Sequence, residues 1–401
     1  MVERTATAII GAGYGDEGKG LLTDALAARD PGKTVVVRFN GGAQAGHTVT
    51  LADGRRHVFS HFGAGSFAGA STFLSRYFVA HPMLFAKERA ALGRIGLEPR
   101  VVIDPRSPVT TPWDMLINQW VENARGLQRH GSVGVGFGET LERHRDPTLR
   151  TTVADLGSPG LRARLDAIAQ RWLPARLAEL GLRCPRIDDM DRTMEAFLVD
   201  VREFLARVEL GEQPPSGGLL FEGAQGLLLD QDLGSFPHVT RSHTGLPNVL
   251  SLAEELGVED IEVIYVTRAY VTRHGAGPLA HPHAACPYPG IVDRTNRPNP
   301  YQGALRFGRL DVDRLSEVVA ADLTRAHRRS SIRLGVAVTC LDQVGPSVDW
   351  VREGRREVSS PEALLSAVAG RLRATVSYAS YGPTRETLSI ARAGDAALSA
   401  S

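Results

Sequence analysis

The feature that most constrains this chain is a glycine-rich loop near its N-terminus. Residues 11–20 read GAGYGDEGKG, and they follow TATAII, a run of β-branched and apolar residues that is typical of a buried strand. After the loop, Leu21, Leu22, Ala25 and Leu26 recur at helical spacing. A strand, a glycine loop and a helix in this order begin a parallel sheet, and the backbone N–H groups of such a loop bind phosphate at the helix N-terminus.

The phosphate loop lacks the residue that usually holds a metal ion. From Gly13 it reads G-x-x-x-x-G-K, but Gly20 stands where Ser or Thr would bind Mg²⁺ through a hydroxyl group. Lys19 is placed to reach the outer phosphates of a nucleotide. Asp16 needs an explanation, because a carboxylate inside a phosphate loop repels the ligand. Either Asp16 coordinates Mg²⁺ in place of the missing hydroxyl, or it removes a proton from the substrate.

A second glycine loop follows the next expected strand. The strand TVVVR runs into FNGGAQAGHTV, in which Gly41, Gly42 and Gly46 surround the polar side chain of Gln44. His47 comes directly after these glycines. A histidine at the end of a strand acts as an acid or as a hydrogen-bond donor beside a phosphate. We therefore interpret this second loop as functional.

The remaining pattern predicts one large α/β domain. Further strands are expected at residues 217–225, 261–270, 333–342 and 373–380, and helices at residues 83–92, 161–180, 194–208, 310–326 and 361–369. We expect residues 1–401 to form a single domain with a central, mostly parallel, twisted sheet, a phosphate loop after the first strand, and helical insertions. Residues 95–216 would form its mainly helical middle region.

Composition argues against several classes of partner. The net charge of +1 at pH 7 gives no field that draws the chain to nucleic acid, and no run of about 18 apolar residues offers a membrane span. The three cysteines lie far apart, which suits a reducing compartment. No basic segment followed by an apolar run marks a signal peptide. We expect a cytoplasmic protein that acts on small molecules, without a nucleic-acid or membrane partner.

Five segments together resemble the adenylosuccinate synthetase family. They are GDEGKG (15–20), GGAQAGHT (41–48), FEGAQG (221–226), TRHGAGP (272–278) and SYGPTRET (380–387). The resemblance implies a ligase that forms a C–N bond and depends on GTP and Mg²⁺. In that family the loop aspartate removes the N1 proton of the hypoxanthine ring. The 6-oxygen then attacks the γ-phosphate of GTP, and the amine of aspartate displaces the resulting phosphate.

The resemblance also implies a role for each matching residue. Asp16 is the general base and a Mg²⁺ ligand, with the carbonyl of Gly46 as a second ligand. Lys19 neutralises phosphate charge, His47 stabilises the transferring phosphoryl group, and Gln225 holds the polar edge of the substrate. The GTP-binding set is Gly15, Asp16, Glu17, Gly18, Lys19, Gly20, Gly46, His47, Thr48, Asp342, Ser380, Tyr381 and Gly382. The substrate-binding set is Gln44, Ala45, Gln225, Thr240, Arg273 and Arg306.

The chain departs from the family where the phosphate of the acceptor nucleotide binds. Gln44 replaces an asparagine, Val133 stands in place of a hydroxyl-bearing residue, and Val135 replaces an arginine. The family also lends an arginine across a homodimer. The resemblance therefore implies a homodimer here, with either Arg145 or Arg150 in that role.

The amine and guanine sites depart as well. Segment 299–311 keeps Arg306, with Arg309 nearby, where the family has a cluster of arginines. The two carboxylates of aspartate need several forked donors, so we expect either poor aspartate affinity or a different amine. Asp342 can still accept hydrogen bonds from the guanine edge, which favours GTP.

These departures leave three catalytic functions open and one non-catalytic function to weigh against them. We favour a paralogue that keeps phosphoryl activation but acts on an altered nucleotide or nucleoside, with aspartate or another amine as the donor. The alternatives are an ordinary adenylosuccinate synthetase of purine biosynthesis and a kinase-like phosphotransferase that releases its phosphorylated substrate. A non-catalytic nucleotide-binding regulator would not need Asp16, Lys19, His47 and Gln225 together.

Overall fold

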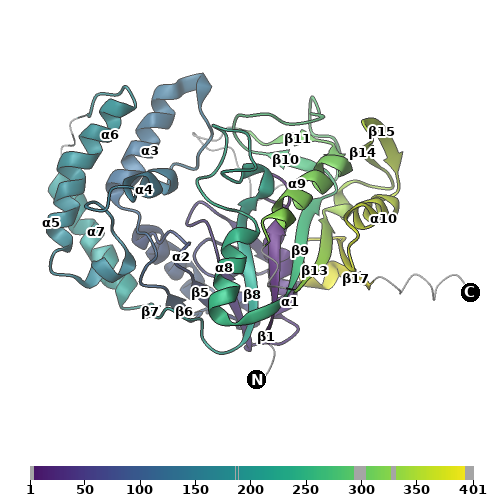
Figure 1. Ribbon diagram of the computed structural model, residues 1–401, viewed down its shortest axis with the longest axis horizontal. Coiled ribbons are helices and arrows are strands. Elements are labelled where there is room, and N and C mark those ends of the chain that lie inside the picture. The colour runs from purple at the N-terminus through teal and green to yellow at the C-terminus, as the bar shows by residue number, and fades with distance from the viewer. Residues whose placement is uncertain (1–3, 186, 188, 293–303, 327–330, 393–401) are drawn as a thin grey trace, which may run out of the picture.

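The computed structural model describes residues 4–185, 187, 189–292, 304–326 and 331–392. Its centre is a sheet in the order β17-β16-β13-β9-β1-β8-β2-β5-β6-β7 (Figure 1). Its strands are β1 (Arg4–Gly11), β2 (Thr34–Arg38), β5 (Ser71–Leu74), β6 (Val101–Ile103), β7 (Glu209–Leu210), β8 (Gly218–Gly226), β9 (Val258–Arg268), β13 (Ser331–Thr339), β16 (Val376–Ser380) and β17 (Leu388–Arg392). Neighbouring strands are parallel except β16 and β17. The expected central, mostly parallel sheet is thus confirmed.

Helices cover both faces of this sheet. They are α1 (Lys19–Ala27), α8 (Leu246–Leu256), α9 (Val312–Thr324) and α10 (Pro361–Leu372). Successive side chains of a strand point to opposite faces. From β1, Ile10 belongs to a core that includes side chains of α8, α9 and α10, whereas Ile9 packs in a core with side chains of α1. The two helical layers therefore fix the strand ends from which the glycine loops start.

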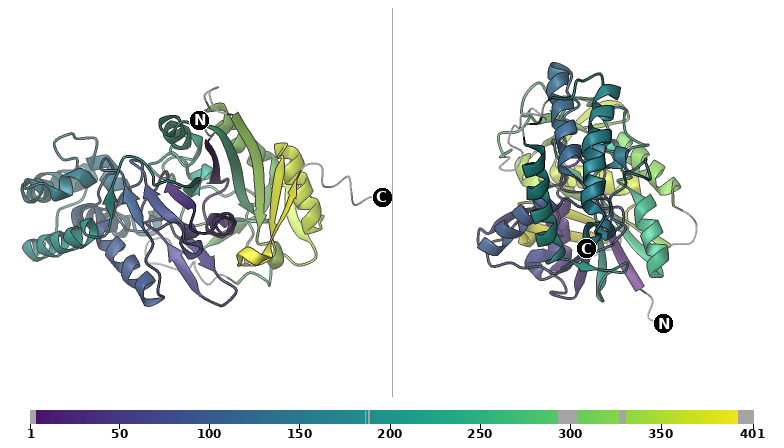
Figure 2. Two further views of the ribbon diagram at one scale, coloured as in Figure 1. Left: turned by 90° about the horizontal axis from the view of Figure 1, so that it is seen from below. Right: turned by 90° about the vertical axis from the view of Figure 1, so that its left-hand side faces the viewer.

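A second group of helices lies at one end of the sheet. They are α2 (Pro82–Arg94), α3 (Pro112–Arg125), α4 (Phe137–Arg143), α5 (Leu161–Ala167), α6 (Leu173–Glu179) and α7 (Met190–Leu205). Their core includes the buried side chains of Trp113, Ile117 and Phe197. Figure 2 shows these helices at the opposite end of the molecule from the C-terminal strands. Residues 95–216 hold α3 to α7, and the division of the chain into one domain stays a prediction.

Smaller ladders carry several of the predicted site residues. β3 (His47–Thr50) pairs with β4 (Arg56–Phe59), and β10 (Val271–Arg273) pairs with β11 (Arg306–Gly308). β12 (Leu310–Asp311), β14 (Val348–Arg352) and β15 (Arg355–Ser359) form a third ladder. Within the described ranges, no helix has the length and apolar character that a membrane span requires.

The sequence pattern locates α2, α7, α9 and α10 but not every helix. Residues 161–180 form α5 and α6 with a π-helical turn at Ile168–Trp172 between them, not one regular helix. α3 and α4 lie in the region expected to be mainly helical, but their individual bounds were not predicted, and α8 lies where no helix is expected. The start of α3 nevertheless carries a local signal, because Thr111 and Asp114 form a capping box and Pro112 takes the first helical position.

Candidate active site

The loops at the carboxyl ends of β1, β2 and β8 meet at one edge of the sheet. These strands are adjacent and parallel, so their ends lie together, as ligand sites of α/β sheets do. The loops form one side of a cavity of about 510 Å³. Of the predicted residues, the cavity is lined by Gly15, Asp16, Lys19, Gln44, Ala45, Gly46, His47, Gln225, Thr240 and Arg273.

The phosphate loop is held from inside by a carboxylate. Glu17 is buried, and its Oε1 accepts hydrogen bonds from the backbone N–H groups of Gly13 (3.0 Å) and Gly15 (2.7 Å). Its Oε2 lies 2.5 Å from Nζ of Lys19. Asp16 has a positive φ of 63°, a conformation that Asp tolerates better than most residues. Glu17 therefore shapes the loop and positions Lys19, and its predicted contact with GTP stays a prediction.

The absence of a hydroxyl at position 20 has a steric cause. A Cβ atom on Gly20 would lie 2.9 Å from the carbonyl oxygen of Thr48 and 3.0 Å from Cβ of His47. The first turn of α1 thus packs directly against the second glycine loop. Any side chain at this position would push the two loops apart, so the loop must obtain a metal ligand elsewhere.

Asp16 is surrounded by positively charged groups. Its Oδ2 lies 3.2 Å from Nε2 of His274, and its carbonyl oxygen accepts a 2.5 Å hydrogen bond from Nε of Arg268. Burial raises the pKa of Asp16, but the hydrogen bond from His274 and the charges of Arg268 and Lys19 outweigh burial, so the pKa lies below its ordinary value. An ionised Asp16 suits both a hard-metal ligand and a proton acceptor. The sequence assigned no role to Arg268 or His274, although TRHGAGP contains His274.

A buried glutamate orients the histidine of the second loop. Nδ1 of His47 lies 2.8 Å from Oε1 of Glu222, whose other oxygen accepts a 3.2 Å hydrogen bond from the N–H of Ala64 and lies 3.7 Å from Nε of Arg38. Burial lowers the pKa of His47, while the charge of Glu222 opposes this change. With Nδ1 held, Nε2 of His47 is the atom left for a ligand. Glu222 lies inside FEGAQG, but its role was not predicted.

Two amide side chains offer neutral hydrogen-bonding groups to the cavity. Gln225 has a positive φ of 64°. A Cβ atom on Gly15 would lie 3.5 Å from Oε1 of Gln225, which places the amide beside the phosphate loop. Both polar atoms of the Gln44 side chain are buried and have no hydrogen-bond partner within the described part of the chain. These amides are suited to the polar edge of a heterocycle.

The predicted guanine-binding residues lie at the next strand ends of the same sheet edge. Asp342 sits in a 3-10 turn, Leu341–Gln343, directly after β13, and burial raises the pKa of its carboxyl group. Thr339 ties this end to the phosphate loop through a 2.7 Å hydrogen bond from Oγ1 to the carbonyl of Glu17. Ser380 ends the neighbouring strand β16, and its Oγ donates to the carbonyl of Gly382 at 2.8 Å. These residues do not line the 510 Å³ cavity, so their contact with GTP stays a prediction.

The arginines considered for the amine carboxylates are engaged with the protein itself. Nη2 of Arg306 donates to the carbonyls of Gly275 (2.7 Å) and Gly277 (3.0 Å). Nε of Arg309 lies 2.8 Å from Oδ2 of Asp349. Residues 299–303 of this segment lie outside the described residues.

The arginine expected to act across a dimer also has contacts within its own chain. Arg145 lies 3.1 Å from Glu142, and Nε of Arg150 donates to the carbonyl of His144 at 2.6 Å. Both side chains are exposed, and neither lines the cavity of its own chain. A role for Arg145 or Arg150 in a partner's site therefore stays a prediction.

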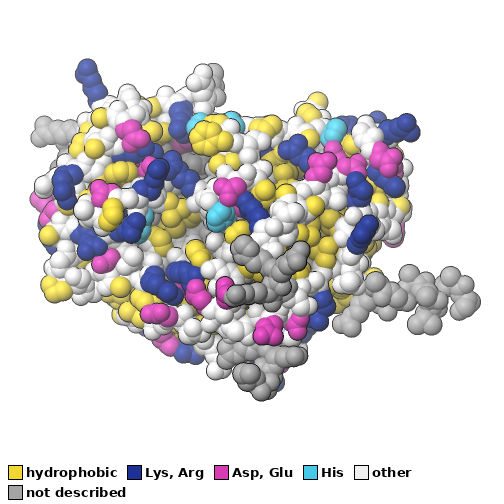
Figure 3. All heavy atoms as spheres, viewed as in Figure 1, with side chains coloured by type: hydrophobic (Ala, Val, Ile, Leu, Met, Phe, Trp, Pro, Cys, Tyr) yellow, Lys and Arg dark blue, Asp and Glu magenta, His cyan; other side chains and the backbone are white. Residues whose placement is uncertain are grey.

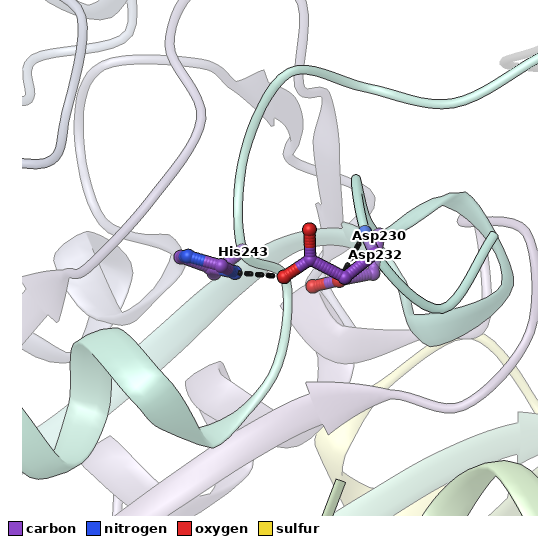
Figure 4. A group of neighbouring side chains, drawn as sticks. All are labelled: Asp230, Asp232 and His243. Atoms are coloured by element: carbon purple, nitrogen blue, oxygen red, sulfur yellow. Dashed lines mark hydrogen bonds and ion pairs between the residues drawn. The ribbon is translucent and has the colours of Figure 1, made fainter. Parts of the chain in front are cut away.

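A cluster of Asp230, Asp232 and His243 resembles a metal site by its composition alone (Figure 4). Nη2 of Arg325 lies 3.1 Å from Oδ1 of Asp230 and 3.0 Å from Oδ2 of Asp232. The other oxygen of Asp230 accepts a 2.6 Å hydrogen bond from the N–H of Thr244. The guanidinium already supplies the positive charge, so we interpret the cluster as an ion-pair network.

Comparisons with known proteins agree with the resemblance of the loops. The family model described as adenylosuccinate synthetase matches residues 8–284. An adenylosuccinate synthetase of Neisseria gonorrhoeae is 34% identical over 283 residues, which cover 68% of this chain and 63% of that relative. The match therefore spans less than two thirds of that relative's length. A second one, of Xylella fastidiosa, is 33% identical over 333 residues, covering 78% of this chain and 73% of the relative.

Two solved structures share the fold. The fully ligated adenylosuccinate synthetase from Plasmodium falciparum aligns with a TM-score of 0.73 and 18% identity, over 96% of this chain and 100% of that chain. The succinoaminodeoxyadenylate synthetase (PurZ) of cyanophage S-2L, bound to dGMP and to dATP as an energy donor, aligns with a TM-score of 0.56 and 16% identity, over 97% and 95% of the two chains. Together with the family match over residues 8–284, these findings show that the chain belongs to the adenylosuccinate synthetase family.

Proposed function

We propose that this protein is a GTP- and Mg²⁺-dependent C–N ligase of the adenylosuccinate synthetase type. It phosphorylates the 6-oxo group of IMP or a related purine-like nucleotide or nucleoside, and then replaces that group with the amine of aspartate or another donor. The observation that carries the proposal is the meeting of Asp16, Lys19 and His47 on one side of a single cavity, with the amides of Gln44 and Gln225 beside them.

The chemistry follows from the poor leaving ability of an amide-type oxygen. Asp16 accepts the N1 proton of the ring, the 6-oxygen attacks the γ-phosphorus of GTP, and GDP leaves. The amine nitrogen then attacks C6 and gives up a proton to solvent, and inorganic phosphate leaves with the former 6-oxygen. Lys19 neutralises charge on the transferring phosphoryl group, and His47 stabilises that group as an acid or hydrogen-bond donor.

The donor set of the phosphate loop fits Mg²⁺. An ionised Asp16 carboxylate and the carbonyl of Gly46 are the hard oxygen ligands that this ion prefers, and Gly20 excludes the usual hydroxyl. When bound, Mg²⁺ neutralises negative charge on the phosphates of GTP. The side chains of the protein carry the other roles. Glu17 holds the loop, the amides of Gln44 and Gln225 orient the ring, and Asp16 accepts the proton.

A phosphate-release assay with GTP, Mg²⁺ and a lactam acceptor tests this function. We expect release only when an amine is also present, and we include aspartate, other amino acids and ammonia. Arg306 donates to the carbonyls of Gly275 and Gly277. Arg309 pairs with Asp349. Because both arginines are engaged within the protein, we expect weak saturation by aspartate or preference for a less charged amine. A phosphorylated acceptor released without amine would favour the kinase alternative. Absence of turnover with every acceptor would remove the proposal.

We further propose that the protein is a cytoplasmic homodimer. The cysteines Cys184, Cys286 and Cys340 are free thiols, which suits a reducing compartment. The exposed Arg145 and Arg150 are available to a partner subunit. Sedimentation at micromolar concentration should give a dimer, and a fully active monomer would contradict the assembly.

A further inference from the structure

The loop that carries Asp16 packs against the ends of two neighbouring strands. β9 and β13 are adjacent and parallel, and in their register Arg268 pairs with Thr339. Arg268 is the last residue of β9, and Thr339 is the last residue of β13. The two side chains therefore start from the same level of the sheet, and both contact the phosphate loop.

Two successive carbonyl groups of the loop accept hydrogen bonds from these side chains. Nε of Arg268 donates to the carbonyl oxygen of Asp16 at 2.5 Å. Oγ1 of Thr339 donates to the carbonyl oxygen of Glu17 at 2.7 Å. Thr339 also limits the next residue, because a Cβ atom on Gly18 would lie 2.9 Å from its Cγ2. The ends of β9 and β13 thus fix the path of the loop around its acidic residues.

Asp16 needs such support because its backbone conformation is unfavourable. Its φ of 63° lies in the left-handed region, which residues other than glycine seldom adopt. A residue keeps such a conformation only where the surrounding structure holds it there. The hydrogen bond from Arg268 comes from a charged donor, and such bonds are stronger than bonds between neutral groups. Arg268 is therefore well placed to hold the backbone of Asp16.

Arg268 is itself fixed by a tyrosine. Its Nη1 lies 3.4 Å from the hydroxyl oxygen of Tyr270, and its Cζ lies 5.7 Å from the centroid of that ring. Tyr270 is buried, and its hydroxyl group donates to Oε1 of Gln343 at 2.5 Å. Gln343 ends the 3-10 turn that contains Asp342. Arg268 therefore links Asp16 to the turn that is predicted to bind the guanine base.

The charge of Arg268 is directed at the backbone of the loop. Within the described ranges, its side chain contacts the carbonyl of Asp16 and the hydroxyl of Tyr270 but forms no ion pair with a carboxylate. Over the outer face of the molecule, by contrast, basic and acidic side chains are interspersed (Figure 3). An arginine that bonds a loop carbonyl in place of a carboxylate is suited to shape that loop.

We propose that Arg268 is a positioning residue of the reaction, which holds the backbone of Asp16 so that its carboxylate stays in the cavity. Asp16 lines the cavity and Arg268 does not, so Arg268 acts through Asp16 and not on the substrate. The use of Asp16 as a proton acceptor rests on the proposed function. The hold on the loop is independent of that function and is measured without turnover.

Arg268→Met keeps much of the length of the side chain and removes its hydrogen-bond donors. We expect kcat to fall by about tenfold to a hundredfold, which is the size of effect that follows from the loss of one hydrogen bond from a charged group. Arg268→Lys keeps a charged donor but has one nitrogen for two acceptors, so its kcat should lie between those of the wild type and Arg268→Met.

A double-mutant cycle with Asp16→Asn separates positioning from general damage. If Arg268 acts through the carboxylate of Asp16, its loss should matter little once that carboxylate is gone. Arg268→Met should lower the single-turnover rate of phosphate release by about tenfold or more with Asp16 present, but by less than about threefold in the Asp16→Asn background. Equal losses in the two backgrounds would overturn the proposal.

Arg76→Met is the matched control, because Arg76 also packs on a tyrosine. Its Cζ lies 4.5 Å from the ring centroid of Tyr77, and its Nη2 lies 2.9 Å from the hydroxyl oxygen of that residue. Arg76 does not line the cavity. Arg76→Met should therefore keep the kcat per folded molecule and leave the phosphate loop unchanged.

Hydrogen–deuterium exchange of residues 12–20 measures the hold on the loop without turnover. Exchange in this segment should be about tenfold faster in Arg268→Met than in the wild type, and unchanged in Arg76→Met. Wild-type exchange in Arg268→Met would overturn the proposal. If Arg268→Met does not fold, Tyr270→Phe takes its place in both measurements, because it removes only the hydroxyl that orients Arg268. Its changes should be smaller and in the same direction, and no change in either measurement would overturn the proposal.

The outcomes separate this inference from the proposed function. Turnover by the wild type with equal losses in the two backgrounds would overturn the inference and leave the ligase proposal standing. Absence of turnover by the wild type would contradict the ligase, while the exchange of residues 12–20 would still decide whether Arg268 holds Asp16.

Discussion

Nδ1 of His47 lies 2.8 Å from Oε1 of Glu222, a side chain with no exposed surface. Glu222 therefore fixes the ring from below the second glycine loop, and its charge opposes the burial that lowers the pKa of His47. Glu222→Gln keeps the volume of the side chain and removes the negative charge beside His47. We expect turnover to fall by about tenfold to a hundredfold, because the donor to the phosphoryl group is weakened, while the affinity for GTP changes less. Steady-state kinetics with varied GTP measure both quantities.

Glu88→Gln is the matched control for the loss of a buried carboxylate. Glu88 accepts a 2.7 Å hydrogen bond from the N–H of His61 and lies 3.2 Å from its Nδ1, but it does not line the cavity. This variant should lose stability and keep its kcat per folded molecule. Equal losses of kcat in the two variants would contradict a positioning role for Glu222.

Restoring the usual hydroxyl to the phosphate loop should harm the protein. In Gly20→Ser the new Cβ would lie 2.9 Å from the carbonyl oxygen of Thr48, so the first two loops must separate. We expect a loss of about 1–3 kcal/mol in the free energy of unfolding and a large loss of activity. Gly93→Ser is the control, because nothing lies within 4 Å of a Cβ at that position of α2. Denaturant unfolding measures the free energy of unfolding of both variants. A Gly20→Ser variant that is stable and active would contradict a tight contact between position 20 and Thr48.

The sequence predicts the strands of the site well because local signals define them. Runs such as TATAII and TVVVR end in glycines, and the corresponding strands β1 and β2 are adjacent to β8 in the sheet. α3 was missed although Thr111, Pro112 and Asp114 mark its start and Trp113, Ile117 and Val121 recur at helical spacing in the core, so this signal was available in the sequence.

The partners of the catalytic residues could not be predicted, because they come from distant segments. Arg268 and His274 reach Asp16 from the end of β9 and the loop after β10, and Glu222 reaches His47 from β8. No spacing rule links residues that only the sheet order brings together. The packing of Gly20 against Thr48 is of the same kind, since the loop alone shows only a missing hydroxyl.

His81 makes the stability of the protein sensitive to acid. Burial lowers its pKa from 6.5 to about 3. Between these pH values the unfolded chain binds a proton that the folded chain does not, so stability falls as the pH falls, by up to about 1.4 kcal/mol per pH unit. His81→Asn removes the titration and keeps an acceptor for the N–H of Leu84 at the N-cap of α2. The free energy of unfolding should change less between about pH 7 and pH 5 in the variant, and an unchanged slope would contradict this role.

Asp16→Asn tests the proton acceptor. The change keeps the size of the side chain and removes its basic oxygen, while Glu17 and Lys19 still shape the loop. We expect turnover to fall by about 10² or more, with a smaller effect on the affinity for nucleotide. Single-turnover phosphate release and nucleotide titration separate the two effects. Near-normal turnover would remove Asp16 from the mechanism.

The central claim is that the 6-oxygen of the acceptor itself attacks the γ-phosphate of GTP. An acceptor labelled with oxygen-18 at this position tests the claim most directly, with mass spectrometry of the phosphate that is released in the presence of GTP, Mg²⁺ and amine. The mechanism predicts that each phosphate carries the label and that the aminated product has lost it. Phosphate without label would show that water, not the acceptor, attacks GTP, and it would contradict the mechanism built on Asp16, Lys19 and His47.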